Sequence, residues 1–389
     1  MKLTRITGIV AGLSLLVAGM QAQVSLPAVF TDHMVLQQKS EVPVWGWGSA
    51  SATIKVVGSW APLDTATTVV RSDGTWDTTL KTIGAGGPYT LSVLGDGTRE
   101  LKDVMLGEVW LCSGQSNMEW TPMHGIDNSE EEVAAANYPN IRFFHIPKRG
   151  AATPQNNCEA SWAPCTPDRM KSTSAIAYFF GRDLQKDLNV PVGLIVSAWG
   201  GTPAEVWVPE EQVMNNPRIR DVMPDKTYAW WPVEPGVLYN QMISPVVPYA
   251  LAGAIWYQGE SNRDHPDSYG ILLKTMVESW RKSFKKDFPF YLVQIAPFTY
   301  NAGDNGAALV REHQEWVART VPGAGMVAVS DCVADVKNIH PTDKQSVGQR
   351  LANMALGKIY GRLDSGYESP LFESMTIDKN KAVISFLHA

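Results

Sequence analysis

The stretch that decides the fold is Gly107-Glu-Val-Trp-Leu-Cys-Ser-Gly-Gln-Ser-Asn-Met118, in which an apolar run ends in a short polar turn. The apolar part extends from Val104 to Cys112, a length typical of a strand buried on both faces. Four similar runs follow along the chain, and helical periodicity fills the intervals between them. This alternation predicts an α/β domain with a parallel sheet and helices on both of its faces.

The expected elements alternate in order. The strands are Val104–Cys112, Val192–Ala198, Ala252–Tyr257, Phe290–Ile295 and Met326–Val329. The helices are Ser129–Asn137, Ser174–Leu188, Ser268–Phe284, Asn305–Thr320 and Asp343–Tyr360. Ligands of such sheets bind at the carboxyl ends of the strands. The loops that directly follow the apolar runs are therefore the places to search for chemistry.

The segments on either side of this domain have a different pattern. Residues 23–104 contain short strand-like runs separated by turn residues such as Asp73-Gly74, without helical periodicity, which predicts an N-terminal antiparallel β-sandwich domain. Residues 105–362 form the α/β domain. In residues 363–389, Met375–Phe386 reads as a hairpin that turns at Lys379-Asn380. An isolated hairpin is only marginally stable, so we expect the start of a C-terminal β element in a truncated chain.

Residues 1–22 read as a signal peptide. Lys2 and Arg5 supply the positive start, the stretch from Ile6 to Met20 is mostly apolar, and Ala22 is a small residue at a plausible cleavage point. The run is short for a membrane span, although an uncleaved anchor is the alternative. We therefore expect an exported protein, periplasmic or secreted, without a membrane span.

Composition excludes several classes of protein. The chain has 33 basic and 39 acidic residues, so its net charge of −6 lacks the basic footprint of a nucleic-acid binder. Its histidines are scattered without metal-ligand spacing, so we expect no metal. Of the four cysteines, Cys158 and Cys165 can form a local disulfide or remain two buried thiols. The 14 Trp residues suit either a large core or contacts with sugar rings.

Four strand-end loops carry polar residues that are unremarkable one at a time. The first presents Ser116 in a Gly-containing turn, where a helix N-cap is the alternative role. The second contains the pair Gly200-Gly201, and the third presents Gln258, Glu260 and Asn262. The fourth runs from Asp331 to Lys344 and contains Asp335 and His340.

Together these loops supply the parts of a serine esterase. A serine hydroxyl needs a neutral imidazole as its base, and a carboxylate normally orients that imidazole. Donors such as backbone N–H groups and an Asn side chain then bind the developing oxyanion. A histidine base with an ordinary pKa near ~6.5 predicts activity that falls below about pH 6.

The motifs resemble those of a known family. Gly-Gln-Ser116-Asn-Met, Trp-Gly-Gly201-Thr, Tyr-Gln-Gly-Glu-Ser-Asn262 and Ile-His340-Pro are similar to the successive blocks of the SGNH hydrolase superfamily, and most of all to its sialate O-acetylesterase family, which is related to acetylxylan esterases. The resemblance implies a flavodoxin-like three-layer αβα domain. It also implies an exported carbohydrate esterase that needs no cofactor and removes O-acetyl groups from sialic acid or from xylan and other hemicelluloses.

The resemblance assigns roles by position. Ser116 is the nucleophile, His340 is the general base, and the oxyanion hole consists of the N–H groups of Ser116 and Gly201 with the Asn262 side chain; Gly200 is the fallback for Gly201. Lys337 stands where the superfamily has its triad aspartate. Asp335 and Glu260 are therefore competing candidates for the triad acid, and a Ser-His dyad is the third possibility.

The expected substrate contacts are Gln115, Gln258, Trp199 and Trp120, with core packing as the alternative role for each tryptophan. Two other functions compete with the esterase: a glycosidase that uses Glu205 and Glu260 as paired carboxylates, and a non-catalytic carbohydrate-binding protein. Both leave Ser116 and His340 without a role. The sequence does not indicate an oligomeric state.

Overall fold

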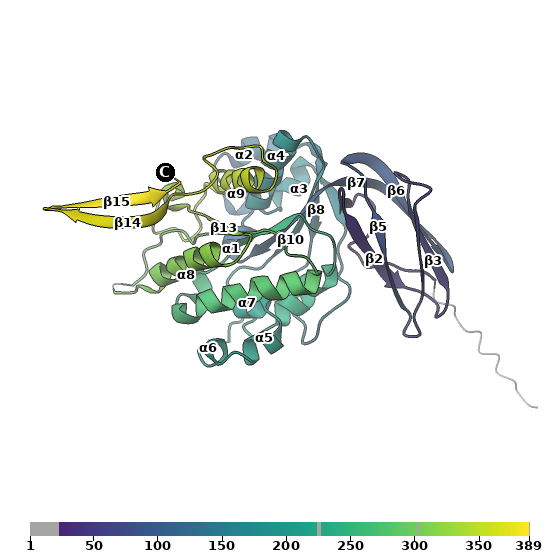
Figure 1. Ribbon diagram of the computed structural model, residues 1–389, viewed down its shortest axis with the longest axis horizontal. Helices are drawn as coiled ribbons and strands as arrows, with labels where there is room; N and C mark the ends of the chain where they lie inside the picture. The colour runs from purple at the N-terminus through teal and green to yellow at the C-terminus, as the bar shows by residue number, and fades with distance from the viewer. Residues whose placement is uncertain (1–22, 224–226, 302, 389) are drawn as a thin grey trace, which may run out of the picture.

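One long strand connects the two main parts of the molecule. The computed structural model describes residues 23–223, 227–301 and 303–388. Strand β7 (Gly97–Gly114) pairs antiparallel with β6 (Gly86–Gly95) in its first half and continues into the parallel sheet in its second half. The N-terminal strands therefore extend from one end of the α/β body, as Figure 1 shows. The expected boundary between residues 104 and 105 falls inside this continuous strand.

The parallel sheet has β7 at its centre. It pairs with β10 (Val192–Ala198) on one side and β11 (Gly253–Tyr257) on the other, and β12 (Phe290–Val293) and β13 (Ala324–Val327) follow β11. All five expected strands are thus present, in the flavodoxin-like order β10-β7-β11-β12-β13. The chain moves to one side of β7 and then to the other, so the loops after β7, β10 and β11 meet at a topological switch point.

Two strands beyond β10 were not predicted from the sequence. Strand β8 (Tyr138–His145) lies parallel to β10, and β9 (Trp162–Cys165) closes that edge antiparallel to β8. The sheet is therefore mixed and not purely parallel. Strand β8 begins with a partly exposed Tyr-Pro-Asn segment, so its buried part is too short to stand out as an apolar run.

Helices cover both faces of the sheet. Helices α4 (Ala175–Leu188) and α9 (Lys344–Lys358) pack together on one face, and α7 (Pro266–Phe284) and α8 (Gly306–Thr320) cover the other (Figure 1). These four and α2 (Ser129–Ala135) are the five expected helices, with ends that differ by two residues or fewer. The remaining α-helices of the described chain are the short α1 (Ser116–Glu119), α3 (Pro167–Lys171), α5 (Glu210–Met214) and α6 (Pro217–Arg220).

The N-terminal strands pair mostly antiparallel. Strand β2 (Glu41–Trp47) pairs with β5 (Thr75–Lys81), while β3 (Thr53–Gly58) pairs with β4 (Thr65–Val69) and β6, and the short β1 (Val35–Gln37) runs parallel to β7. This agrees with the antiparallel β-structure expected for residues 23–104, and the sandwich arrangement stays a prediction.

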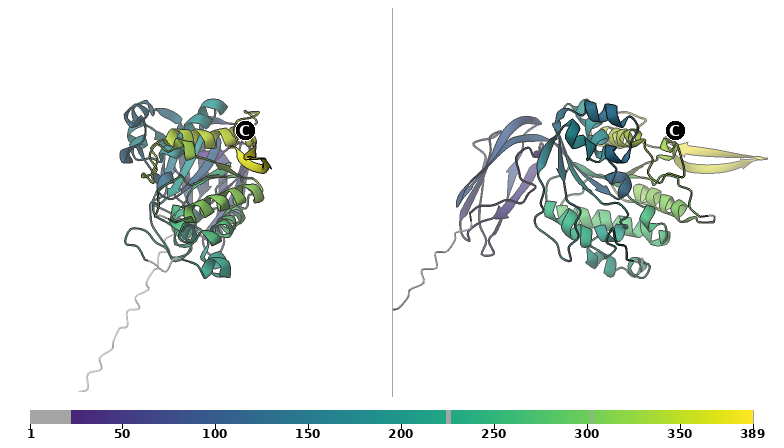
Figure 2. Two further views of the ribbon diagram at one scale, coloured as in Figure 1. Left: turned by 90° about the vertical axis from the view of Figure 1, so that its left-hand side faces the viewer. Right: turned by 180° about the vertical axis from the view of Figure 1, so that it is seen from behind.

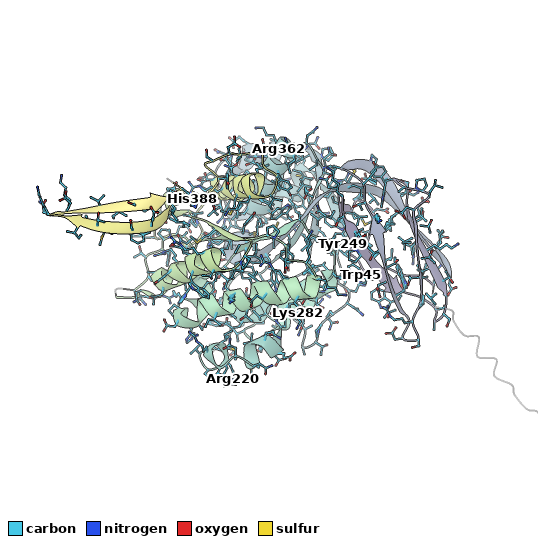
Figure 3. The ribbon with its side chains drawn as sticks, viewed as in Figure 1. Trp45, Arg220, Tyr249, Lys282, Arg362 and His388 are labelled. Carbon is cyan, nitrogen blue, oxygen red and sulfur yellow. The ribbon has the colours of Figure 1, made fainter. Side chains whose placement is uncertain are left out.

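The tryptophans of the strands differ in burial. Trp110 and Trp256 are fully buried, whereas Trp45 and Trp47 are only partly buried. Trp45, Trp47 and Tyr249 line a cavity of about 570 Å³ where β2 meets the α/β body. Figure 3 labels Trp45 and Tyr249 at this junction. The cavity borders residues that precede β11 and β12, so it lies at the edge of the sheet opposite to Ser116.

The C-terminal hairpin is present and projects from the body (Figure 2). Strands β14 (Leu371–Asp378) and β15 (Lys381–Leu387) enclose the expected turn at Lys379-Asn380. One face of the hairpin carries apolar side chains that are about half exposed, namely Phe372, Met375, Ile377, Ile384 and Phe386. That the chain is truncated stays an expectation.

Cys158 and Cys165 are not bridged, and all four thiols are free; the Cys165 Sγ faces the Ala136 carbonyl at 3.6 Å in the core.

In the part of the chain that the structure describes, no helix is long and apolar enough to cross a membrane. The expected signal peptide, residues 1–22, lies outside the described residues, and export stays a prediction.

Candidate active site

Ser116 lies at the topological switch point. It follows the buried end of β7 and opens α1, so its hydroxyl stands at the carboxyl edge of the sheet between the loops after β10 and β11. Ser116 is partly exposed, whereas its neighbours Asn117 and Met118 are buried. The turn therefore exposes the Ser116 hydroxyl, while the burial of the next two side chains holds the turn in place.

His340 contacts this hydroxyl. Its Nε2 lies 2.9 Å from the Oγ of Ser116, although the two residues are 224 positions apart in the chain. The loop between β13 and α9 carries His340 back across the sheet edge, and the His340 backbone N–H donates to the Asn338 side chain at 3.0 Å. This is the hydrogen bond that a serine nucleophile and its general base require.

Neither expected acid orients His340. Asp335 is exposed, and its carboxylate accepts the backbone N–H of Lys337 at 2.9 Å, so it turns back on its own loop. Glu260 is buried below the nucleophile turn, where it accepts a hydrogen bond from the Asn117 amide at 2.7 Å. Within the described residues, no carboxylate hydrogen-bonds His340. Of the three alternatives for the triad acid, Asp335, Glu260 and a Ser-His dyad, the geometry agrees with the dyad, and the identity of the acid stays a prediction.

A buried network joins the three loops around Ser116, and only Glu260 was singled out from the sequence. The Asn117 Nδ2 donates to Glu260 and, at 3.0 Å, to the Ile339 carbonyl next to His340. The Asn117 Oδ1 accepts from the Nζ of Lys344 at 2.6 Å. Asn117 thus bridges two oppositely charged side chains. Burial raises the pKa of Glu260 and lowers that of Lys344 to about 7, and each charge partly offsets the shift of the other.

Two backbone donors point to a place for an oxyanion. The N–H groups of Ser116 and Gly201 have no acceptor within the described residues, so both are available to a ligand. The N–H of Gly200 instead donates to the Glu119 carboxylate at 2.6 Å, which removes the fallback candidate. Gly201 has a φ of +80°, and the Trp231 ring lies so close that a Cβ has no room.

Asn262 lies in a second buried network next to this turn. Its Nδ2 donates to Glu205 at 2.8 Å, and its Oδ1 accepts from the Ala204 N–H and the Gln258 amide. An Asn amide nitrogen carries two hydrogens, so one donor remains beside the bond to Glu205. The network fixes the orientation of the amide.

Gln115 and Gln258 face inward, contrary to the expectation that they contact substrate. The Gln115 Oε1 accepts the N–H groups of Gly259 and Ser261, which ties the nucleophile turn to the loop after β11. Gln258 is fully buried and donates to the Thr202 carbonyl and to Asn262. Both side chains therefore support the site from within.

Trp120 and Trp199 are partly exposed beside the site, as substrate contacts require, but Trp120 has a closer partner. Its ring stacks on His340 with centroids 4.0 Å apart and planes at 19°. Trp199 follows β10, and its backbone N–H donates to Gly114 at 3.1 Å.

Two cavities adjoin the turn after β10. One, of about 280 Å³, is lined by Ala198 and by polar side chains, namely Glu119, Thr121, His124, His145 and Lys148. The other, of about 410 Å³, is lined by Gly201 and by Tyr228, Trp231, Glu260, Arg263 and Asp264. Each cavity is large enough for a sugar ring, and they adjoin the loops around Ser116, although neither lining includes Ser116 or His340.

His340 is neutral at neutral pH. Burial lowers the pKa of His340 to about 4, and the electrostatic effects of Lys344 and His124 act in the same direction. A neutral imidazole can accept a proton from Ser116. The expectation of a fall in activity near pH 6 assumes an unperturbed histidine, and the surroundings of His340 move that fall to lower pH.

The comparisons with known proteins agree on one kind of enzyme. The family model "Carbohydrate esterase, sialic acid-specific acetylesterase" matches residues 106–357. Curated sialate O-acetylesterases of Pongo abelii and Homo sapiens are each 31% identical over 396 residues, which cover 92% of this chain and 75% of theirs. The crystal structure of a carbohydrate acetylesterase from Xanthomonas citri is 34% identical, with a TM-score of 0.83, and the match covers 94% of this chain and 82% of that one.

Proposed function

The chain belongs to the sialic acid-specific acetylesterase family of carbohydrate esterases, and we propose that it removes O-acetyl groups from sugars through an acetyl-serine intermediate. Membership makes it a carboxylic ester hydrolase. The observation that carries the serine mechanism is the 2.9 Å contact between the His340 Nε2 and the Ser116 Oγ at the carboxyl end of β7. Loss of acetate release in the Ser116→Ala variant is the experiment that tests it.

The proposed reaction has two halves. In the first, the Ser116 Oγ attacks the acetyl carbonyl carbon while the His340 Nε2 takes the hydroxyl proton. The protonated His340 then gives this proton to the sugar oxygen, which leaves as an alcohol. In the second half, His340 activates a water molecule that attacks the acetyl-Ser116 ester and releases acetate. In both halves the oxyanion binds to the N–H groups of Ser116 and Gly201 and to the remaining donor of Asn262.

The burial of Glu205 and Glu260 argues against the glycosidase alternative. Glu205 is 1% exposed and Glu260 is 7% exposed, and each accepts a hydrogen bond from a buried asparagine. Paired glycosidase carboxylates must flank the scissile bond of a bound sugar. Glu205, which lines neither cavity beside the site, does not meet that requirement, so Glu260 has no second carboxylate to act with.

The charged side chains around the site affect which class of sugar, anionic or neutral, can bind there. The relatives are named sialate O-acetylesterases, and sialic acid carries a carboxylate, whereas xylan is neutral. The lysine and the arginine that line the two cavities are already paired with carboxylates, Lys148 with Glu119 at 2.5 Å and Arg263 with Asp264 at 3.0 Å. A sialate must compete for these cations. Acetate release from O-acetylated sialic acid and from acetylated xylan, measured side by side, separates the two classes.

The Trp231→Ala substitution is expected to weaken binding of an acetylated oligosaccharide. Trp231 stacks on Tyr228 with centroids 4.9 Å apart and lines the cavity next to Gly201. An aromatic face of this kind suits a sugar ring, so we expect KM for the oligosaccharide to rise roughly 10-fold with a smaller change for 4-nitrophenyl acetate. Trp230→Ala is the matched control, because Trp230 is 79% exposed. Equal losses with both substrates in Trp231→Ala show an effect through Gly201 instead.

The pH profile of kcat/KM is expected to reflect the lowered pKa of His340. Only the neutral imidazole can act as the base, so a pKa lowered to about 4 keeps the enzyme active to lower pH than an ordinary histidine allows. Acetate release should therefore reach half of its maximum well below pH 6. His124→Gln removes the electrostatic effect of His124 on His340 and is expected to shift this midpoint upward. A wild-type midpoint at or above ~6.5 contradicts the assignment of a buried, neutral base.

A further inference from the structure

An aromatic ring covers one face of the His340 imidazole, which has no carboxylate partner within the described residues. Trp120 lies almost parallel to it, with ring centroids 4.0 Å apart and planes at 19°. The indole itself is fixed, because its Nε1 donates to the Gly125 carbonyl at 2.9 Å. Trp120 also directly follows α1, the helix that begins with Ser116, so the nucleophile and the indole belong to one short segment.

We propose, on the premise of the serine mechanism above, that Trp120 is a positioning residue that replaces the triad acid of His340. A triad carboxylate has two tasks: it holds the imidazole in the reactive orientation, and it stabilises the imidazolium that forms when the base takes the serine proton. The indole face meets both. Stacking fixes the plane of the His340 ring, and the π face attracts the positive charge that appears on it.

The charges that face His340 make the second task necessary. Lys344, at the start of α9, and His124, in the turn after α1, both disfavour a positive charge on the ring. The two candidate acids are engaged elsewhere, Asp335 with the Lys337 backbone and Glu260 with Asn117. Trp120 contacts both His124 and Lys344: its ring is 4.9 Å from the His124 ring, and the Lys344 Nζ is 5.9 Å from its centroid. The indole is therefore an electron-rich surface in direct contact with the forming imidazolium.

Trp120→Phe and Trp120→Leu test the proposal with 4-nitrophenyl acetate, a substrate without a sugar. Phenylalanine keeps an aromatic face, so we expect kcat to fall only a few-fold, whereas leucine removes the face and should lower kcat roughly 30-fold with little change in KM. The acid midpoint of the pH profile should move to lower pH in Trp120→Leu, because the imidazolium has lost its stabilising partner. Thermal unfolding of both variants monitors the fold.

Three outcomes overturn the proposal. If Trp120→Leu keeps its kcat and pH midpoint but raises KM for an acetylated oligosaccharide, Trp120 is a sugar platform. If Phe and Leu lower kcat equally, the indole only fills space. If the midpoint stays in place while kcat falls, the ring does not interact with the charge. Activity that survives Ser116→Ala refutes the serine mechanism itself, a result distinct from all three.

Discussion

Ser116→Ala is expected to lower the rate of acetate release by about 10⁴-fold or more. The substitution removes the hydroxyl oxygen that attacks the acetyl carbon in the proposed mechanism, while the proposed oxyanion donors, the N–H groups of Ser116 and Gly201, stay in place. Residual activity should therefore resemble the small acceleration that an oxyanion hole gives without a nucleophile. Release of acetate from 4-nitrophenyl acetate and from an acetylated glycan, measured with purified protein, checks the result.

Ser113→Ala provides the matched control for this experiment. Ser113 lies three residues earlier, in β7; it is fully buried, and its hydroxyl has no hydrogen-bond partner among the described residues. Replacement of an unpartnered buried hydroxyl by a hydrogen should leave stability and activity nearly unchanged. If Ser116→Ala retains activity comparable to Ser113→Ala, the acetyl-serine intermediate is wrong and another group attacks the ester.

Sequence patterns were sufficient for the sheet and for the position of the site because both follow from periodicity. Apolar runs of strand length mark the buried strands β7, β10, β11, β12 and β13, and the polar residues after them must lie at one edge of a parallel sheet. Strand β8 was not predicted, because only its second half is buried. The pairing of Ser116 with His340 follows from the same argument, although 224 residues separate them.

The orientation of side chains within the loops is what periodicity cannot predict. Gln115, Gln258 and Asp335 all follow strands at the expected edge, yet the first two turn inward and the third turns back on its own loop. Backbone conformation in an irregular loop depends on which donors find acceptors, and these are distributed over segments far apart in sequence. The stacking of Trp120 on His340 was missed for the same reason, since it joins the turn after α1 to the loop before α9.

The burial of Lys344 was not predicted from the sequence, because a lysine at a helix start usually remains solvated. In the structure it is 1% exposed, and its ammonium group donates to Asn117, whose amide in turn donates to Glu260. Removal of one member of a buried charge pair leaves the other charge without compensation, which typically costs about 3–5 kcal/mol. Lys344→Met is therefore expected to lower the free energy of unfolding by about this amount, measured by urea denaturation. Lys337→Met, at an exposed position of the preceding loop, should change it by less than about 0.5 kcal/mol.

The double variant decides whether Lys344 and Glu260 act as a pair. Glu260→Gln alone leaves a buried ammonium without its counter-charge, whereas Lys344→Met with Glu260→Gln leaves neither charge, so the double variant should lose less stability than the sum of the single variants, by about 1 kcal/mol or more. Activity should follow the same order, because Asn117 also holds the Ile339 carbonyl, and with it the loop that carries His340 to Ser116. Strictly additive losses refute the coupling. A full loss of activity in Glu260→Gln with unchanged stability, together with a shifted pH profile, indicates instead that Glu260 reaches His340 as a true triad acid during turnover.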